Sequence, residues 1–251
     1  ECAGSEIKPV VAPHQHGQTL AQLHSGGEKE VAQGIEAALR AKQQWSECSF
    51  DERAAVFLNA AELLAGPYRA RMNAATMLGQ SKTVHQAEID AACELIDFWR
   101  YNVHFARRII EEQPQSVDGV WNRLDYRPLD GFVLAVSPFN FTSIAGNLCT
   151  APALMGNTVV WKAATTSVLS AQVIMDILLE AGLPKGVVNL VHAPGSMVGK
   201  SALSHPDLAG VHFTGSTATF QHMWSQVGQN IKNYRTYPRL VGETGGKDFI
   251  F

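Results

Sequence analysis

The residues best suited to chemistry are an asparagine, a lysine and a glutamate that each lie at the end of an apolar run. Asn140 follows the run from Gly131 to Val136, and its side-chain N–H could donate to a ligand oxygen. Lys162 closes the run NTVVWK and could hold ribose or phosphate oxygens. Glu243 precedes Thr-Gly-Gly and could act as a general base on a nearby water. Each also has a structural alternative: turn backbone for Asn140, an extended surface lysine for Lys162, and a turn carboxylate for Glu243.

A further candidate ligand site is the sequence Phe-Thr-Gly-Ser at 213 to 216. It leaves an apolar run and opens a helical pattern, so its backbone N–H groups and the positive helix end would suit a pyrophosphate. The same residues could instead serve only as a helix cap. Gly195 and Gly199 form a Gly-x-x-x-Gly pattern, which differs from the GxGxxG motif of dinucleotide sites and is weak evidence by itself.

The first 112 residues predict an N-terminal arm and a layer of four helices. Residues 1 to about 25 suggest short edge strands or an arm, and apolar spacing with start and stop signals predicts helices over 27 to 44, 49 to 64, 68 to 78 and 83 to about 112. Glu94 lies in the last helix, where it could point into a cleft or lie exposed, and the spacing does not choose. Alternating segments around Gly119, between 113 and 130, predict a hairpin.

From residue 131 onward the pattern alternates between strand and helix. Strands are predicted at 132 to 137, 157 to 162, 187 to 191, 209 to 213, 238 to 242 and 247 to 251. Helices are predicted at about 142 to 155, 166 to 182 and 216 to 232, with a short one after Gly195. Continuous apolar, β-branched strands separated by helices predict an α/β fold with a parallel sheet wrapped by helices. Since ligands bind at the carboxyl ends of such strands, the candidate residues should meet along one edge.

Composition and charge exclude several classes of protein. A chain of 251 residues with 46% hydrophobic and 17% charged residues can form one large domain, or one domain with an appendage. Twenty basic and 23 acidic residues give a net charge of −3, which indicates neither nucleic acid nor an anionic membrane as a partner. The apolar runs are far shorter than the roughly 20 residues of a membrane span. The four cysteines, Cys2, Cys48, Cys93 and Cys149, form no CxxC pair, so we expect no metal site and a reduced intracellular compartment.

Five segments resemble the motifs of the aldehyde dehydrogenase superfamily in order and spacing. They are SPFNF at 137 to 141, NTVVWK at 157 to 162, EAGLP at 180 to 184, FTGS at 213 to 216 and ETGG at 243 to 246. Segments at 77 to 83, 86 to 98 and 237 to 240 further resemble the branch that oxidises L-glutamate γ-semialdehyde, the 1-pyrroline-5-carboxylate dehydrogenases. The resemblance covers essentially the whole chain. It implies a Rossmann-like sheet and an NAD-dependent oxidoreductase of proline catabolism.

The resemblance also implies a role for each motif residue. In the family a cysteine thiolate attacks the aldehyde, hydride passes to nicotinamide, and the thioester is hydrolysed. Asn140 would stabilise the oxyanion, and Glu243 would help to activate water. Glu94 and Phe141 would flank the aldehyde substrate. The residues expected at the cofactor are Ser137, Pro138, Phe139, Lys162, Thr165, Gly195, Gly199, Phe213, Thr214, Gly215, Ser216 and Gly245.

The sequence departs from the family pattern in two places. Ala163 follows the ribose lysine where the family has proline, and Thr165 replaces the ribose-binding glutamate, so the expectation of NAD over NADP has less support. None of the four cysteines lies in the motif of the nucleophile, which the family places beyond the motif glutamate and past Phe251. We therefore expect these residues to be the cofactor-binding half of the enzyme, able to bind NAD at most and inactive alone.

The resemblance implies three parts, which are an N-terminal arm and helical layer at 1 to 112, an oligomerisation hairpin at 113 to 130, and a Rossmann-like NAD-binding core at 131 to 251. The expected partners are a small aldehyde and, at full length, a homodimer or higher homo-oligomer, in the cytoplasm or in the mitochondrial matrix of a eukaryote. Three alternatives stay open, namely a non-catalytic dinucleotide-binding module, the aldehyde-oxidising part of a bifunctional proline-utilisation protein, and a dehydrogenase for another semialdehyde.

Overall fold

A five-stranded parallel sheet forms the centre of the computed structural model, which describes residues 6–246 and 250–251. All neighbouring strands are parallel, in the order β5-β4-β3-β6-β7, which confirms the predicted fold class. The strand bounds are β3 Phe132–Val136, β4 Thr158–Lys162, β5 Val188–Leu190, β6 Leu208–Gly215 and β7 Arg239–Thr244. The chain winds from the central β3 outward to β5 and then returns to β6 and β7, so the winding direction changes between β3 and β6.

The predicted strands agree with these five to within a few residues, and the sixth cannot be placed. The strand expected at 247 to 251 falls partly on residues 247–249, which lie outside the described residues, and residues 250 and 251 are not in a strand. The prediction for β6 was too short, because this strand continues through Thr214 and Gly215 to pair with Glu243 and Thr244 of β7. Thr214 and Gly215 of the Phe-Thr-Gly-Ser motif therefore lie within the sheet.

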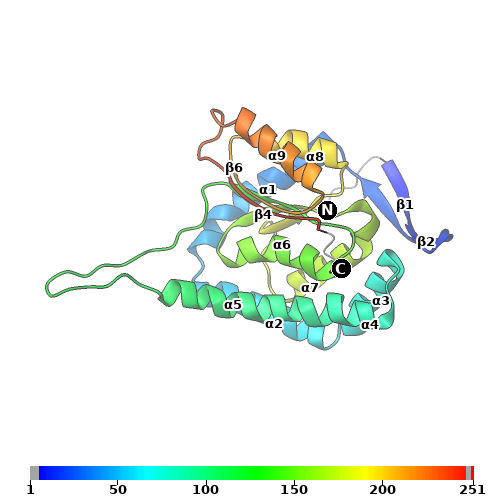
Figure 1. Cartoon of the computed structure of the whole chain (residues 1–251), viewed down its shortest axis with the longest axis horizontal. Coiled ribbons are helices and arrows are strands. Elements are labelled where there is room, and N and C mark those ends of the chain that lie inside the picture. Colours follow the sequence, from blue (N-terminus) through cyan, green and yellow to red (C-terminus); the bar gives the residue numbers. More distant parts are fainter. Residues whose placement is uncertain (1–5, 247–249) are drawn as a thin grey trace.

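Helices cover both faces of the sheet (Figure 1). Helices α6 (Thr142–Leu154) and α7 (Val168–Glu180) pack on one face, where Val133 and Ala135 of β3 are buried. Helices α1 (Glu28–Glu47), α8 (Gly195–Leu203) and α9 (Thr217–Gln229) cover the other, where Phe132 and Leu134 are buried. Because successive side chains of β3 enter opposite cores, the strand must be apolar throughout.

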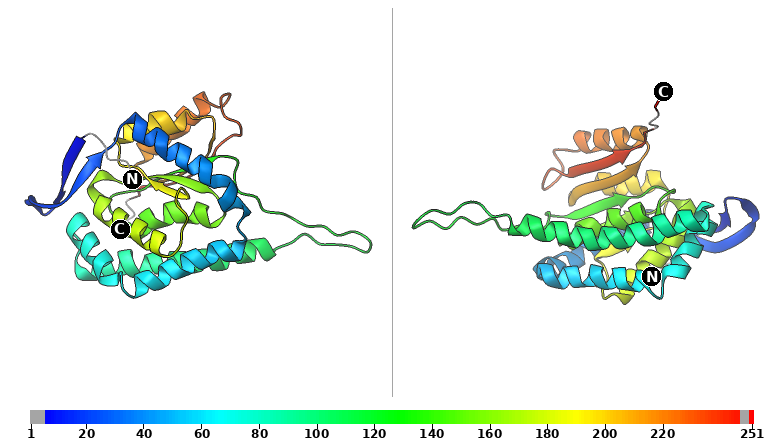
Figure 2. Two further views of the ribbon diagram at one scale, coloured as in Figure 1. Left: turned by 180° about the vertical axis from the view of Figure 1, so that it is seen from behind. Right: turned by 60° about the horizontal axis from the view of Figure 1, so that its bottom comes forward.

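A further layer of helices lies outside α6 and α7 (Figures 1 and 2). It contains α2 (Phe50–Ala65), α3 (Arg69–Gln80), α4 (Val84–Ala87), the π-helix η1 (Glu88–Glu94) and α5 (Leu95–Glu111). The helix predicted from 83 to about 112 is therefore one continuous helical segment, but residues 88–94 adopt the π form that the sequence pattern did not reveal. Such segments recur at functional sites. No helix in the described residues is long and apolar enough to cross a membrane.

Helix α6 is held at its carboxyl end by side chains from other elements. Pro152 lies inside the helix and has no N–H for the carbonyl of Leu148, which instead accepts a hydrogen bond from His212 Nδ1 of β6 at 3.0 Å. Trp45 Nε1 donates to the carbonyl of Ala153 at 2.8 Å, and Arg53 Nε donates to that of Leu154 at 2.9 Å. The carbonyl groups of this enclosed helix end therefore have partners in place of water.

Two segments extend from the body (Figures 1 and 2). Strands β1 (Glu6–Ala12) and β2 (Gln15–Ser25) form an antiparallel pair, within the region predicted as edge strands or an arm. Residues 112–130 form a long arm with one antiparallel bridge, Val117 to Val120, so the predicted hairpin is incomplete. The Trp121 side chain on this arm is 76% exposed, and no hydrophobic core of the described residues covers it. An isolated two-stranded ribbon of this kind is only marginally stable.

The start of β3 requires glycine at position 131. Gly131 has φ of 145°, and an added Cβ would lie 2.0 Å from the carbonyl oxygen of Asp207. We predict that Gly131→Ala lowers the free energy of unfolding by about 3 kcal/mol, through backbone strain and overpacking. Gly119→Ala is the matched control, because Gly119 also has positive φ, 78°, with no atom within 4 Å of an added Cβ. It should cost about 1 kcal/mol. Urea denaturation measures both, and equal losses would contradict the steric argument.

Candidate functional site

The predicted site residues gather along the carboxyl edge of the sheet. Val136, at the end of β3, lies in register with Lys162 of β4 and with Phe213 of β6. Thr214 of β6 lies beside Glu243 of β7. The turn that follows β3 therefore leaves the sheet between the strand ends that carry the other motifs, at the point where the winding direction changes.

The turn after β3 is anchored to β4 and leaves its asparagine free. Ser137 is buried, its N–H donates to the Lys162 carbonyl at 3.2 Å, and its Oγ accepts from Trp161 Nε1 at 3.0 Å. Phe139, Asn140 and Phe141 are exposed, and Pro138 between them and Ser137 is half-buried. No other described residue bonds to the Asn140 side chain, so its amide N–H can donate to a ligand.

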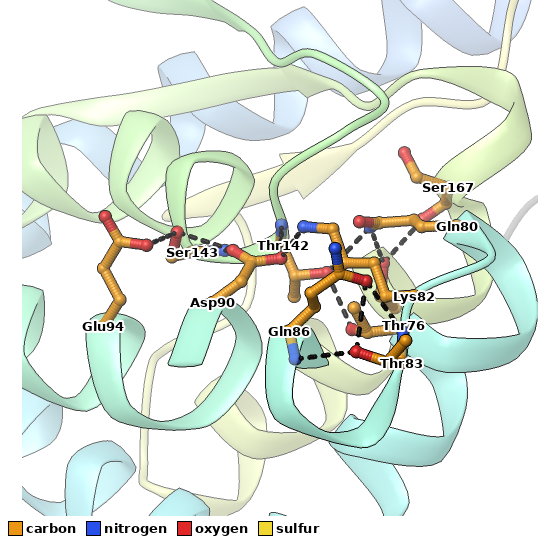
Figure 3. Close-up of polar contacts among 11 residues, drawn as sticks. Thr76, Gln80, Lys82, Thr83, Gln86, Asp90, Glu94, Thr142, Ser143 and Ser167 are labelled. Atoms are coloured by element: carbon orange, nitrogen blue, oxygen red, sulfur yellow. Dashed lines mark hydrogen bonds and ion pairs between the residues drawn. The ribbon is translucent and has the colours of Figure 1, made fainter. Parts of the chain in front are cut away.

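A buried carboxylate that the sequence analysis missed supports this turn from beneath (Figure 3). Asp90 of η1 is 2% exposed. It accepts hydrogen bonds from the backbone N–H groups of Thr142 and Ser143, both at 3.0 Å, and from Ser143 Oγ at 2.8 Å. Lys82 Nζ lies 2.6 Å from Asp90 Oδ2. The negative charge thus sits at the positive end of α6, where the orphan N–H groups need an acceptor.

Two features of the sequence point weakly to a role for Asp90. Phe141 is the residue before the first turn of α6 and has no side-chain acceptor, so the helix start lacks a local cap. Asp90 precedes Glu94 by four residues on a helical segment, a spacing that places two side chains on one face. The missing cap of α6 and the acidic residue near Glu94 are consistent with a cap from a distant part of the sequence. They do not identify Asp90 as that cap.

The two predicted substrate residues lie against the same group of side chains. Glu94 is half-buried, and its Oε2 accepts from Ser143 Oγ at 2.9 Å, so the alternative of a fully exposed carboxylate does not hold. The Phe141 ring centroid lies 4.3 Å from Lys82 Nζ. Glu94 and Phe141 therefore both connect to the cluster formed by Lys82, Asp90 and Ser143.

A hollow of about 170 Å³ lies beside the ends of β4 and β5. Its lining residues are Lys8, Leu23, Ser25, Ala163, Thr165, Val168, His192, Ala193 and Pro194. Lys162 Cε lies 4.0 Å from the Cβ position of Gly195, at the start of α8. Among described residues the Lys162 side chain has no hydrogen-bond or ion-pair partner, and the buried Nδ1 of His192 has none either. This region thus holds two polar groups without a partner.

Burial shifts the pKa of both groups. It lowers the pKa of Lys162 below its usual range. It also lowers the pKa of His192, and the nearby Lys162 charge lowers it further. A ligand with hydroxyl or phosphate oxygens would supply the missing acceptors for Lys162.

The Phe-Thr-Gly-Ser motif combines residues with structural contacts and residues that are partly exposed at the strand end. Ser216 Oγ accepts from the N–H of Thr219 at 3.2 Å, so Ser216 does cap α9. Phe213 is 2% exposed and stacks on Phe220 with centroids 5.5 Å apart, which leaves only its backbone for the predicted cofactor contact. Thr214 and Gly215 are half-buried at the strand end. Gly199 lies half-buried within α8, and Gly245 is exposed just after β7.

None of the described cysteines forms part of this site. Cys149 is buried in α6, where desolvation raises the pKa of its thiol. Cys48 Sγ donates to the Gln44 carbonyl, and Cys93 lies against Arg69 and Glu88. Within residues 6–246 and 250–251, no group of three or more His, Cys, Asp or Glu could hold a metal ion.

A larger hollow of about 380 Å³ next to Gly186 and Val187 includes none of the predicted site residues.

Comparison with known proteins gives consistent relatives. The model of the aldehyde dehydrogenase family matches residues 2–251. The probable delta-1-pyrroline-5-carboxylate dehydrogenase of Schizosaccharomyces pombe is 50% identical over 94% of this chain and 44% of its own length. The human mitochondrial delta-1-pyrroline-5-carboxylate dehydrogenase is 48% identical over 98% of this chain and 44% of its own length. The chain thus spans less than half the length of these relatives.

Solved structures agree with the sequence relatives. The delta-pyrroline-5-carboxylate dehydrogenase of Mycobacterium tuberculosis, solved with NAD bound, has a TM-score of 0.97 and 61% identity, covering 99% of this chain and 46% of that chain. Proline utilization A of Bdellovibrio bacteriovorus has a TM-score of 0.90 and 28% identity, covering 98% of this chain and 26% of that one. On this sequence match and this fold, the chain belongs to the aldehyde dehydrogenase family.

Proposed function

We propose that this chain is the cofactor-binding part of an NAD-dependent dehydrogenase that oxidises L-glutamate γ-semialdehyde to glutamate in proline catabolism. One observation carries the proposal: relatives named delta-1-pyrroline-5-carboxylate dehydrogenase align over 94% to 98% of the chain at 48% to 50% identity. The gathering of the motif residues along one sheet edge supports it, because that edge is where doubly wound folds bind dinucleotides. In this proposal residues 1–112 form the N-terminal arm and the helical layer, and residues 131–251 form the NAD-binding core.

The adenosine end of NAD would lie at the hollow beside β4 and β5. His192 lines this hollow, and Lys162 lies near it at the end of β4. Neither side chain has a partner in the described chain, and the ribose hydroxyls would offer them acceptors and donors. Thr165 also lines this hollow. The start of α9, with Gly215 and Ser216, would hold the pyrophosphate through backbone N–H groups. NAD, when bound, supplies the hydride acceptor.

Asn140 is assigned the role of oxyanion donor. Its amide has no partner among the described residues, and it belongs to the turn that leaves β3 between the ends of β4 and β6. A donor of this kind typically contributes about 3 to 4 kcal/mol to the stabilisation of the transition state. Glu243, exposed at the end of β7, would take a proton from the water that releases the product. Glu94 and Phe141 would lie on either side of the aldehyde. None of the four cysteines lies in the motif that the resemblance assigns to the nucleophile, so residues 1–251 alone should bind NAD without turnover.

We assign the arm at residues 113–130 to self-association. It exposes large apolar side chains, including Val117, Trp121 and Leu124, on a segment that extends away from the body. A second copy of the protein could cover these side chains in a homodimer or higher homo-oligomer. The cytoplasm is the proposed location, or the mitochondrial matrix if the source is a eukaryote, where several relatives are named mitochondrial.

The first prediction from the proposed function tests cofactor binding and turnover. Calorimetric titration should detect NAD binding to the chain, and Lys162→Met should weaken it about tenfold through loss of a charged hydrogen bond. Lys185→Met, at the rim of the other hollow, is the matched control and should have no effect. The chain with NAD and the semialdehyde should form no NADH, whereas the whole protein should. NADH formation by the chain that Asn140→Ala abolishes would refute the proposed division of labour.

The second prediction concerns the charge coupling in the hollow. Burial and the Lys162 charge both lower the pKa of His192, so Lys162→Met should raise this pKa toward the ordinary value while leaving it below. Proton NMR titration of the imidazole measures the shift, with Lys185→Met as control. An unchanged or lower pKa in Lys162→Met would show that the two side chains are not coupled.

The third prediction concerns the arm. In the whole protein, Trp121→Asp should weaken self-association by at least about 2 kcal/mol, because it places a charge where a large apolar surface must be covered. Light scattering after size exclusion should then detect smaller species at micromolar concentration. Trp224→Asp, at an exposed tryptophan on α9, is the matched control and should retain the native assembly. Equal effects of the two substitutions would remove the arm from the interface.

A further inference from the structure

A buried ion pair beneath the Asn140 turn has no role in the proposed chemistry. The Lys82 and Asp90 side chains are 15% and 3% exposed, with Nζ and Oδ2 2.6 Å apart. Removing both charges from water is costly, and a buried pair of this kind is weak evidence for stability alone. Its location, between the start of α6 and the residues assigned to the substrate, suggests a different use.

Asp90 fixes where α6 begins. Its two oxygens bind the N–H groups of Thr142 and Ser143, the first two residues of the helix, across 52 and 53 positions of sequence. Bonds from backbone N–H to an ionised carboxylate are among the stronger hydrogen bonds. Asn140 and Phe141 directly precede these residues, so a shift of the helix start would move both.

Lys82 joins Asp90 to the ring of Phe141. The same ammonium that pairs with Asp90 lies 4.3 Å from the Phe141 ring centroid, within the range of a cation–π contact. Phe141 is otherwise exposed. The ammonium therefore restrains a side chain that the sheet itself does not hold.

Ser143 joins Asp90 to Glu94. Its single hydroxyl hydrogen faces two carboxylate oxygens, Asp90 Oδ1 at 2.8 Å and Glu94 Oε2 at 2.9 Å, and it can donate to only one at a time. When the hydroxyl donates to Asp90, Glu94 keeps its full capacity to accept from a ligand. Among the described residues, Lys82 is the one cation that pairs with this group of carboxylates, and it does so through Asp90 (Figure 3).

We propose that Lys82 and Asp90 are positioning residues that set the places of Asn140, Phe141 and Glu94 relative to one another. Asp90 holds the start of α6, and Lys82 holds the Phe141 ring. Ser143 connects Asp90 to the Glu94 carboxylate. This inference rests on the proposed function, because it takes Asn140 and Phe141 to lie at the aldehyde. It assigns Lys82 and Asp90 no contact with the reacting atoms.

The test compares substitutions in the whole protein. Lys82→Met keeps the buried stem but removes the ammonium, so it should raise the KM for the aldehyde at least tenfold and leave the Kd for NAD within twofold. Lys82→Arg, which can pair with Asp90 and stack on the ring, should restore most of kcat/KM. Lys42→Met is the matched control, because it breaks another ion pair, Lys42 with Asp130 at 2.7 Å, and should change KM less than twofold.

Two further measurements separate positioning from stability. Phe141→Leu leaves the ion pair intact and should reproduce the increase in KM without lowering the thermal midpoint. Hydrogen exchange in Asp90→Asn should be faster at the Thr142 and Ser143 amides than in the native protein, while amides of β3 stay protected. Native-like exchange at Thr142 and Ser143, or Lys82→Met with a KM within twofold of native, would overturn the proposal. A parallel loss of NAD affinity would also overturn it, because that indicates general damage.

The outcome for the proposed function is separate. If the native whole protein does not oxidise the semialdehyde, the proposed substrate is wrong, and the same variants are then compared on whichever aldehyde the native protein oxidises. If it oxidises none, the hydrogen-exchange comparison still decides whether Asp90 holds the start of α6.

Discussion

The site depends on the hydrogen bonds that two charged side chains make with the backbone at the two ends of α6. The helix is enclosed between the sheet and the outer layer, so water cannot serve its unpaired backbone groups. The Asp90 carboxylate lies at the amino end and the Arg53 guanidinium at the carboxyl end, and each complements the helix dipole. Both come from the outer helical layer. The outer helices therefore determine the position of a turn that belongs to the sheet.

The site has two supports of different origin. On the cofactor side, the parallel strands themselves bring Lys162, Gly215 and Glu243 to one edge, and little else is needed. On the substrate side, Asp90 and Glu94 reach the same place from a π-helix in the outer layer. Asn140 lies where the two supports meet. Each half of the proposed reaction thus depends on a different layer of the fold.

Local patterns predicted the parts of the fold that local chemistry determines. The sheet followed from continuous apolar strands, since a strand with Phe132 and Val133 in opposite cores must be apolar at both positions. Asp90 could not be found in this way, because the helix start that it caps lies more than 50 residues away and its own neighbours resemble any polar helix face. The π form of residues 88–94 was also not predicted, because apolar spacing indicates a helix without indicating its hydrogen-bond register. The arm was predicted as a hairpin from alternation alone, without a surface to pack on.

The bond from His212 to the carbonyl of Leu148 has a consequence for the dynamics of the site. It ties α6 to β6 at the point where Pro152 would otherwise leave the helix weak and free to bend. With the opposite end held by Asp90, α6 and β6 should move as one rigid unit. The turn that carries Asn140 and the end of β6 at Thr214 and Gly215 are then preorganised before any ligand arrives, and little conformational entropy remains to be lost there on binding.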